Sequence, residues 1–79
     1  MIENEVKEMI ARELKADITA IKPETRLVED LKADSANIMV MIMDVEDRYG
    51  IMVEDDQIMK LRTVADVVRY IEEHKSSAV

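Results

Sequence analysis

The sequence predicts a small all-α fold, a bundle of three longer helices and one short helix. The chain has 79 residues but only one glycine and one proline, too few for the tight turns of a multi-stranded sheet. Apolar residues also recur at the three- and four-residue spacing of amphipathic helices. We therefore expect residues 1–79 to form one domain, with a core over about 3–74 and a flexible tail at 75–79.

The first helix is expected over about residues 3–15. Val6, Ile10 and Leu14 recur every four positions with Met9 beside them, which makes one apolar stripe. A long connection follows to Asp34, and an ordered loop of this length needs side chains of its own to pack. We expect one helical turn near 27–31 and packing by Ile18, Ile21, Leu27, Val28 and Leu31.

The second helix has the clearest boundaries. Asp34 and Ser35 are good N-cap residues, and Gly50 after Tyr49 is a good left-handed C-cap. At about 100° per residue, the core side contains Ile38, Ile42, Val45 and Tyr49, with Met41 at its margin. The opposite side is also apolar: Ala36, Met39, Val40 and Met43. This side is either buried in a central helix of the bundle or exposed for a partner, and methionine adapts well to different partner surfaces.

Two further helices complete the fold. A short one is expected at residues 55–60, with acidic residues in its first turn. Thr63 then caps a last helix, with Asp66 in a capping-box position. Its apolar stripe is Val64, Val67, Val68 and Ile71. We expect Tyr70 to be packed, and His74 to interact with the dipole at the end of this helix.

Composition excludes several classes of function. The net charge of -7 disfavours a nucleic-acid binder, which needs clustered cations, and favours partners with basic surfaces. Cysteine is absent and histidine occurs once, so no metal site is expected. The acidic run at 54–56 is interpreted as a helix start. The longest apolar run, Ile38 to Met43, is too short to span a bilayer, so we expect no membrane insertion. We also expect a cytoplasmic location, which the absence of cysteine permits, and a monomer.

Ser35 is the candidate for a reactive or covalently modified residue. A catalytic serine needs a base within reach, and the one histidine, His74, lies at the far end of the sequence. No phosphate loop or nucleophile elbow is present either, so we expect no enzymatic activity. A modified serine fits better, because a helix N-terminus favours a negatively charged phosphodiester.

At this point the sequence resembles the acyl carrier protein family. The resemblance starts with Leu-Val-Glu-Asp-Leu-Lys-Ala-Asp-Ser at 27–35. It continues through Met-Asp-Val-Glu-Asp-Arg-Tyr-Gly-Ile at 43–51, Lys-Leu-Arg-Thr-Val at 60–64 and Val-Val-Arg-Tyr-Ile at 67–71. It therefore covers the chain from about Val6 to Glu73. An Asp-Ser pair alone is weak evidence, but the pair at this spacing is specific.

The resemblance implies an up-and-down four-helix bundle and a 4'-phosphopantetheine arm, transferred from coenzyme A to Ser35 by a phosphopantetheinyl transferase. The arm carries acyl groups as thioesters on its own thiol, which agrees with the absence of cysteine. Asp34 would be the acidic neighbour that helps hold magnesium during arm transfer. Candidate docking residues are Ala36, Asn37, Met39, Val40, Met43, Glu46, Asp47 and Asp55. Candidate acyl-pocket residues are Ile38, Met41, Ile42, Val45, Val53, Ile58, Met59 and Leu61.

Three departures from the family pattern surround the serine. Asn37 stands where an acid is common, Val40 where glutamate is usual, and Ala36 where a large aliphatic residue is usual. These changes predict an altered choice of partner, and hence a specialised carrier served by its own acyl-loading ligase or synthase. The pathway stays open between fatty-acid, polyketide and specialised lipid synthesis. A peptidyl or aminoacyl carrier and an unmodified interaction module are the alternatives.

Overall fold

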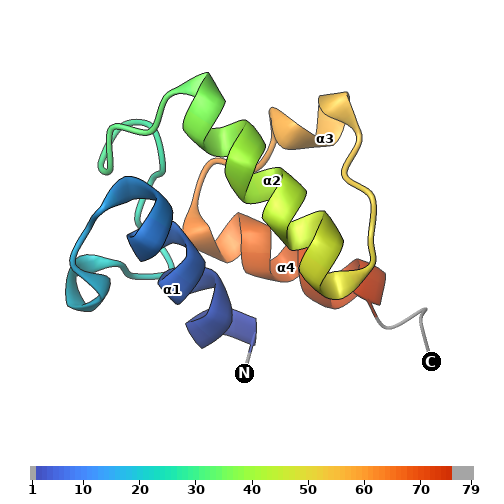
Figure 1. Cartoon of the computed structure of the whole chain (residues 1–79), viewed down its shortest axis with the longest axis horizontal. Coiled ribbons are helices and arrows are strands. Elements are labelled where there is room, and N and C mark those ends of the chain that lie inside the picture. The colour runs from blue at the N-terminus through green and yellow to red at the C-terminus, as the bar shows by residue number, and fades with distance from the viewer. Residues whose placement is uncertain (1, 76–79) are drawn as a thin grey trace.

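The computed structural model describes residues 2–75 and confirms the all-α prediction. Its helices are α1 (Ile2–Leu14), α2 (Ser35–Tyr49), α3 (Asp55–Ile58) and α4 (Val64–Lys75), with a 3-10 helix, η1 (Ile18–Ala20), between α1 and α2 (Figure 1). Within the described residues, the only β-type pairing is an isolated bridge between Arg26 and Thr63. No helix in this part of the chain is long and apolar enough to cross a membrane.

The helices α1 and α2 run antiparallel and are linked at both ends by polar side chains. The Tyr49 hydroxyl donates to Glu5 at one end, and the side-chain amide of Asn37 donates to Glu13 at the other. The third long helix, α4, packs against both of them. The buried core draws on all three helices and the connections: Val6, Met9, Ile10, Ile21, Leu27, Ala33, Met41, Ile42, Val45, Ile51, Val53, Val64, Val67, Tyr70 and Ile71.

The predicted boundaries and faces of α2 are confirmed. Asp34 is the N-cap, and Gly50 ends the helix in the left-handed conformation with φ 65°. The expected core residues are buried or half-buried, including Met41, which lies fully inside. The opposite residues, Ala36, Met39, Val40 and Met43, are all exposed. Because these four are exposed, the interpretation of α2 as a central helix buried on most sides is wrong.

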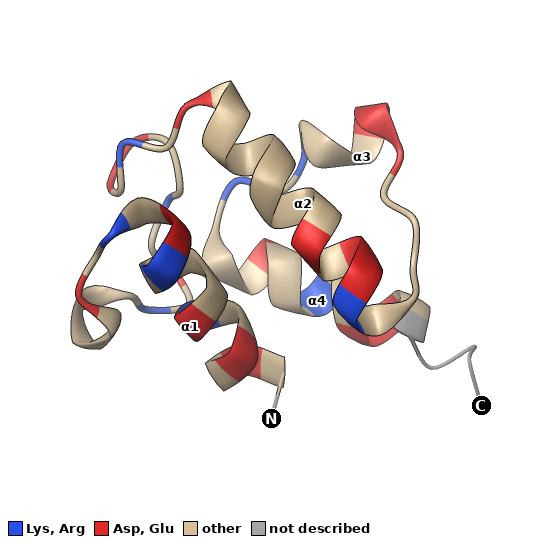
Figure 2. Ribbon diagram, in the orientation of Figure 1, with Lys and Arg blue, Asp and Glu red and all other residues tan. Residues whose placement is uncertain are grey.

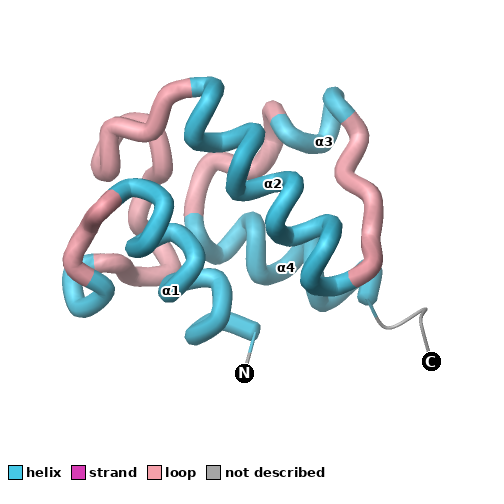
Figure 3. The backbone as a smooth tube through the Cα atoms, viewed as in Figure 1, coloured by secondary structure: helices cyan, strands magenta, loops and turns pink. Residues whose placement is uncertain are grey.

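The α1–α2 connection is mostly loop, interrupted by the short helix η1 (Figure 3). Fewer of its side chains pack than expected. Ile21 and Leu27 are buried and Leu31 is half-buried, whereas Ile18 and Val28 are exposed. The expectation that these last two pack is therefore wrong. The predicted turn is present, because the amide of residue 30 donates to the carbonyl of 26 and that of 32 to the carbonyl of 28.

Backbone hydrogen bonds attach this connection to the start of α4. The Leu27 N–H donates to the Arg62 carbonyl at 2.9 Å, and the Val64 N–H donates to the Thr25 carbonyl at 3.1 Å. These bonds place residues 25–27 beside α4, and the buried Ala33 leads from there into α2. The segment that precedes Ser35 is thus fixed by the C-terminal part of the chain.

The two last helices agree with the sequence except at the end of α3. This helix ends at Ile58 rather than residue 60, because the Lys60 and Leu61 amides bond to the carbonyls three residues back instead of four. The capping box of α4 is confirmed, since the Asp66 N–H donates to Thr63 Oγ1 and the Thr63 N–H donates to Asp66 Oδ2. The expected flexible tail at 75–79 lies outside the described residues, apart from the last residue of α4.

Candidate functional site

Ser35 is the first residue of α2 and its side chain is exposed. The preceding residue, Asp34, has extended backbone, with φ -101° and ψ 179°, and its Oδ1 accepts from the Asn37 N–H at 2.9 Å. The Asn37 Oδ1 accepts in return from the Asp34 N–H at 3.2 Å, which completes a capping box. Asn37 therefore fills the position in which glutamate or glutamine is usual in such a box.

The start of α2 is suited to an anion. The amides of Ser35 and Ala36 lie in the first turn, where no intrahelical acceptor exists, and the helix dipole adds positive potential there. The backbone N–H of Asn37, in contrast, already donates to the Asp34 side chain in the capping box. A phosphate ester on the Ser35 oxygen would therefore lie against unpaired donors.

A surface groove begins at Ser35. It has a volume of about 440 Å³ and lies between the start of α2, the connection before it and the α3 region. Its lining is mostly apolar: Val28, Glu29, Ser35, Ile38, Met39, Ile58, Met59, Leu61 and Arg62. Three of these, Val28, Glu29 and Arg62, are absent from the sequence-based candidates. The backbone bond from Leu27 to Arg62 brings these segments together, and no local pattern indicates it.

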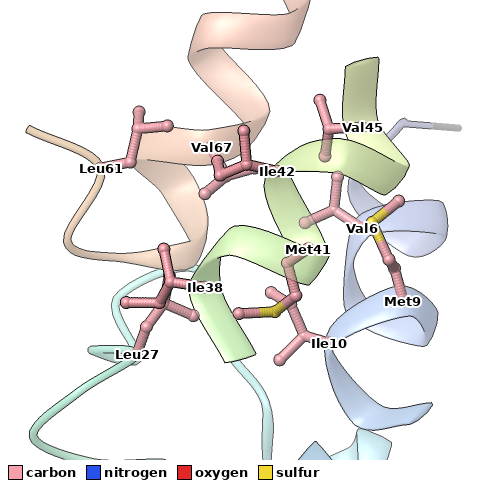
Figure 4. A pocket seen from close by; sticks show the side chains of 10 residues that line it. All are labelled: Val6, Met9, Ile10, Leu27, Ile38, Met41, Ile42, Val45, Leu61 and Val67. Carbon is pink, nitrogen blue, oxygen red and sulfur yellow. The ribbon is translucent and has the colours of Figure 1, made fainter. Parts of the chain in front are cut away.

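A small cavity of about 20 Å³ lies inside the core (Figure 4). Side chains from α1, α2, α4 and two connecting segments converge on it. Five of the predicted acyl-pocket residues line it: Ile38, Met41, Ile42, Val45 and Leu61. Two of them, Ile38 and Leu61, also line the surface groove, so they form the partition between the two spaces.

The remaining predicted pocket residues lie elsewhere. Ile58 and Met59 line the surface groove, and Met59 is 80% exposed rather than packed in the core. Val53 is buried but lines neither space. The structure thus divides the predicted pocket between an interior cavity and an open groove.

The predicted docking residues also separate into two groups. Six are exposed: Ala36, Met39, Val40, Met43, Asp47 and Asp55. The other two are half-buried and bonded inward, since Asn37 belongs to the capping box and Glu46 Oε2 accepts from the Val53 N–H at 2.9 Å. Figure 2 shows that the first half of α2 lacks charge, whereas acidic residues gather on its second half and at the start of α3.

The two tyrosines and the histidine have structural surroundings. Burial, followed by the hydrogen bond with Glu5, raises the pKa of Tyr49 to about 12. Tyr70 is buried as predicted, and its hydroxyl donates to the Met52 carbonyl at 2.9 Å. The His74 ring stacks on Tyr70 with centroids 3.9 Å apart, and its Nδ1 lies 2.8 Å from the Tyr70 carbonyl oxygen near the end of α4. This agrees with the helix-end role expected for His74.

Comparisons with known proteins agree with this site. The family described as phosphopantetheine attachment site matches residues 4–71. An acyl carrier protein from Rickettsia massiliae (strain Mtu5) is 44% identical over 75 residues, which are 95% of this chain and 87% of the relative. The solution structure of a candidate acyl carrier protein from Anaplasma phagocytophilum has a TM-score of 0.84 at 31% identity, covering 91% of this chain and 85% of that chain. The acyl carrier protein from Enterococcus faecalis has a TM-score of 0.80 at 25% identity, covering 91% of each chain.

The helical fold and the family match define a phosphopantetheine-dependent carrier domain. Within this class, the chain belongs to the acyl carrier protein family. It is a non-catalytic carrier of acyl groups on a covalently attached 4'-phosphopantetheine. Proteins of this family interact with enzymes such as synthases and transferases.

The residues present fit the phosphopantetheine group. The exposed Ser35 hydroxyl can form the phosphate ester, and the unpaired amides of the first turn of α2 suit its charge. The groove beside Ser35 offers a mostly apolar surface along which a chain-like arm can lie. The group itself supplies a terminal thiol that forms thioesters with acyl groups.

Proposed function

We propose that Ser35 is the residue that carries the 4'-phosphopantetheine arm, and that this carrier serves a specialised set of enzymes in the cytoplasm. One observation carries the attachment: an exposed serine is the first residue of α2 and opens onto the groove. The other serines of the chain are Ser76 and Ser77, which lie outside the described residues.

Asp34 supports the attachment in two ways. Its Oδ1 holds the first turn of α2 through the Asn37 amide, so the position of Ser35 is fixed before the transferase binds. Among residues 2–75, no hydrogen bond is made to the second oxygen, Oδ2. This oxygen is therefore available to a magnesium ion that accompanies coenzyme A on the transferase.

The docking surface is proposed to be the exposed apolar side of α2, named here the outer face: Ala36, Met39, Val40 and Met43. Asp47 and Asp55 are exposed beyond it, on the second half of α2 and at the start of α3. A partner that fits this combination has an apolar contact surface with basic residues at its edge. Phosphopantetheinyl transferases and acyl-loading ligases or synthases of this kind are the proposed partners, binding the chain as a monomer.

The cavity and the groove are the proposed sites of the acyl chain. The cavity of about 20 Å³ has room for roughly one water molecule, so an acyl chain enters the core only if the side chains around it move. Met9 and Met41 line the cavity, and unbranched methionines repack at low cost. A long-chain acyl form should therefore shift the NMR signals of Ile38 and Leu61 relative to the unacylated arm. Unchanged signals at both residues would refute acyl binding at this partition.

Intact mass measurement tests the attachment site. The purified protein is incubated with coenzyme A, magnesium and several phosphopantetheinyl transferases. We expect a mass gain of one arm that disappears in Ser35→Ala and persists in the matched control Ser76→Ala. A mass gain that remains in Ser35→Ala would mean that the arm is attached to another residue. No gain with any transferase would favour an unmodified interaction module.

A further inference from the structure

Asn37 makes three hydrogen bonds at the start of α2, and one of them leaves the helix. Its N–H and its Oδ1 bond to Asp34 in the capping box, at 2.9 and 3.2 Å. Its Nδ2 donates to Glu13 Oε2 on α1 at 3.1 Å. Both side chains of this interhelical bond are half-buried, where a hydrogen bond to a charged group is stronger than one at an open surface. Asn37 thus joins the capped turn directly to α1.

We infer that Asn37 is a positioning residue for arm attachment, which fixes the Asp34-Ser35 segment to the end of α1. This inference rests on the proposed role of Ser35. The serine lies between the two residues of the capping box, so its backbone is part of the turn that the box closes. Since Glu13 holds the Asn37 side chain from outside the helix, the position of Ser35 is defined relative to α1 as well as within α2.

This pair of hydrogen bonds needs a side-chain amide at position 37, because one atom of the group must accept and another must donate. The carbonyl oxygen of Asn37 accepts from the Asp34 backbone while its nitrogen donates to Glu13. An aspartate at this position could still accept from the backbone, but it has no donor for Glu13. It would place two carboxylates at the short distance now occupied by a hydrogen bond, and like charges so close repel each other.

This role differs from that of a docking residue. Asn37 is half-buried and bonded at both ends of its amide group, whereas the members of the outer face are exposed. A docking residue acts on partner binding, so its replacement raises KM. A positioning residue acts on the alignment of the reacting hydroxyl, so its replacement lowers kcat.

Steady-state arm transfer to full-length variants separates these roles. Asn37→Asp removes the donor, and we expect a kcat about threefold lower with KM nearly unchanged. We also expect hydrogen exchange of the backbone N–H at position 37 to be about tenfold faster in this variant, because the capped turn opens more often. Glu13→Gln retains an acceptor oxygen and should show a smaller loss in both measurements.

The double variant Asn37→Asp, Glu13→Gln is the matched control, because its net charge equals that of the wild type. The glutamine can donate to the new aspartate, so the bond is restored with its direction reversed, and both measurements should return toward wild-type values. Absence of this rescue, or a change confined to KM, overturns the inference and leaves the attachment to Ser35 intact. A wild-type protein that gains no arm on Ser35 overturns the proposed function, and this inference with it.

Discussion

The hydrogen bond between Tyr49 and Glu5 predicts a stability that depends on alkaline pH. An ordinary tyrosine has a pKa of 10.0, and burial together with this bond raises the pKa of Tyr49 to about 12. The folded state therefore holds the phenolic proton more tightly than the unfolded state does. The resulting stabilisation is complete below pH 10 and is lost as pH rises from 10 to 12.

The size of this effect follows from the pKa change and the exposure of the ring. A rise from 10 to 12 corresponds to at most about 2.7 kcal/mol of unfolding free energy. Because the Tyr49 side chain is only half-buried, solvent screening reduces the contribution to roughly 1 kcal/mol. Replacing Tyr49 by phenylalanine removes the hydroxyl, so it should cost about 1 kcal/mol at pH 7.

Chemical denaturation of the wild type and of Tyr49→Phe between pH 7 and pH 12 tests this reasoning. All other ionisable groups are the same in both proteins, so their contributions cancel in the difference between the two unfolding free energies. We expect this difference to stay constant up to pH 10 and to approach zero by pH 12. A difference that stays constant over the whole range would refute the link between the Tyr49 proton and the folded state.

Two other substitutions test the docking surface and the end of α2. Val40→Glu adds a carboxylate to the outer face at a residue that is 48% exposed. It should change unfolding free energy by less than about 0.5 kcal/mol, while shifting the ratio of kcat/KM values between basic and apolar partner enzymes about tenfold; an unchanged ratio contradicts the docking proposal. In Gly50→Ala, the new Cβ would have no neighbouring atom within 4 Å, but the alanine would have to keep φ at 65°. Denaturation should therefore show a loss of about 1 kcal/mol in unfolding free energy from backbone strain alone. A loss several times larger would mean that the new methyl group collides with the structure.

The parts of the fold that could be predicted are those that depend on near neighbours in the chain. Both ends of α2 follow from residues with strong local preferences, Asp34 at the start and Gly50 at the end. Helical periodicity also identifies the residues opposite the core side of α2, but it leaves open whether they are buried or exposed. The end of α3 could not be predicted this way, because the switch from four-residue to three-residue hydrogen bonds after Ile58 has no clear sequence signal.

The candidate site was predictable to a similar extent. Ser35 could be singled out because the features that mark it, an N-cap and an apolar helix, are adjacent in sequence. Arg62 could not, because it reaches the groove only through the backbone pairing of its segment with Leu27. Glu13 was missed for the same reason, since its bond to Asn37 joins residues 24 positions apart. The need of a long ordered loop for packed side chains does not indicate which of its apolar residues turn inward, so the exposure of Ile18 and Val28 could not be predicted.

The structure also separates two tasks that the sequence places on one helix. The inward polar residues of α2, Asn37 and Glu46, hold α1 and the backbone of Val53, so they contribute to the shape of the site rather than to its surface. In the proposed docking mode, the exposed acids beyond the outer face, Asp47 and Asp55, would act at longer range. Charges in water are felt over about 8 Å at physiological salt, so these acids can guide a basic partner before contact. In the same proposal, the outer face would act only after contact, when apolar area is removed from water. The docking proposal therefore predicts that partner encounter and partner retention depend on different residues, so that a change in the outer face alters which enzyme stays bound without slowing the approach of the others.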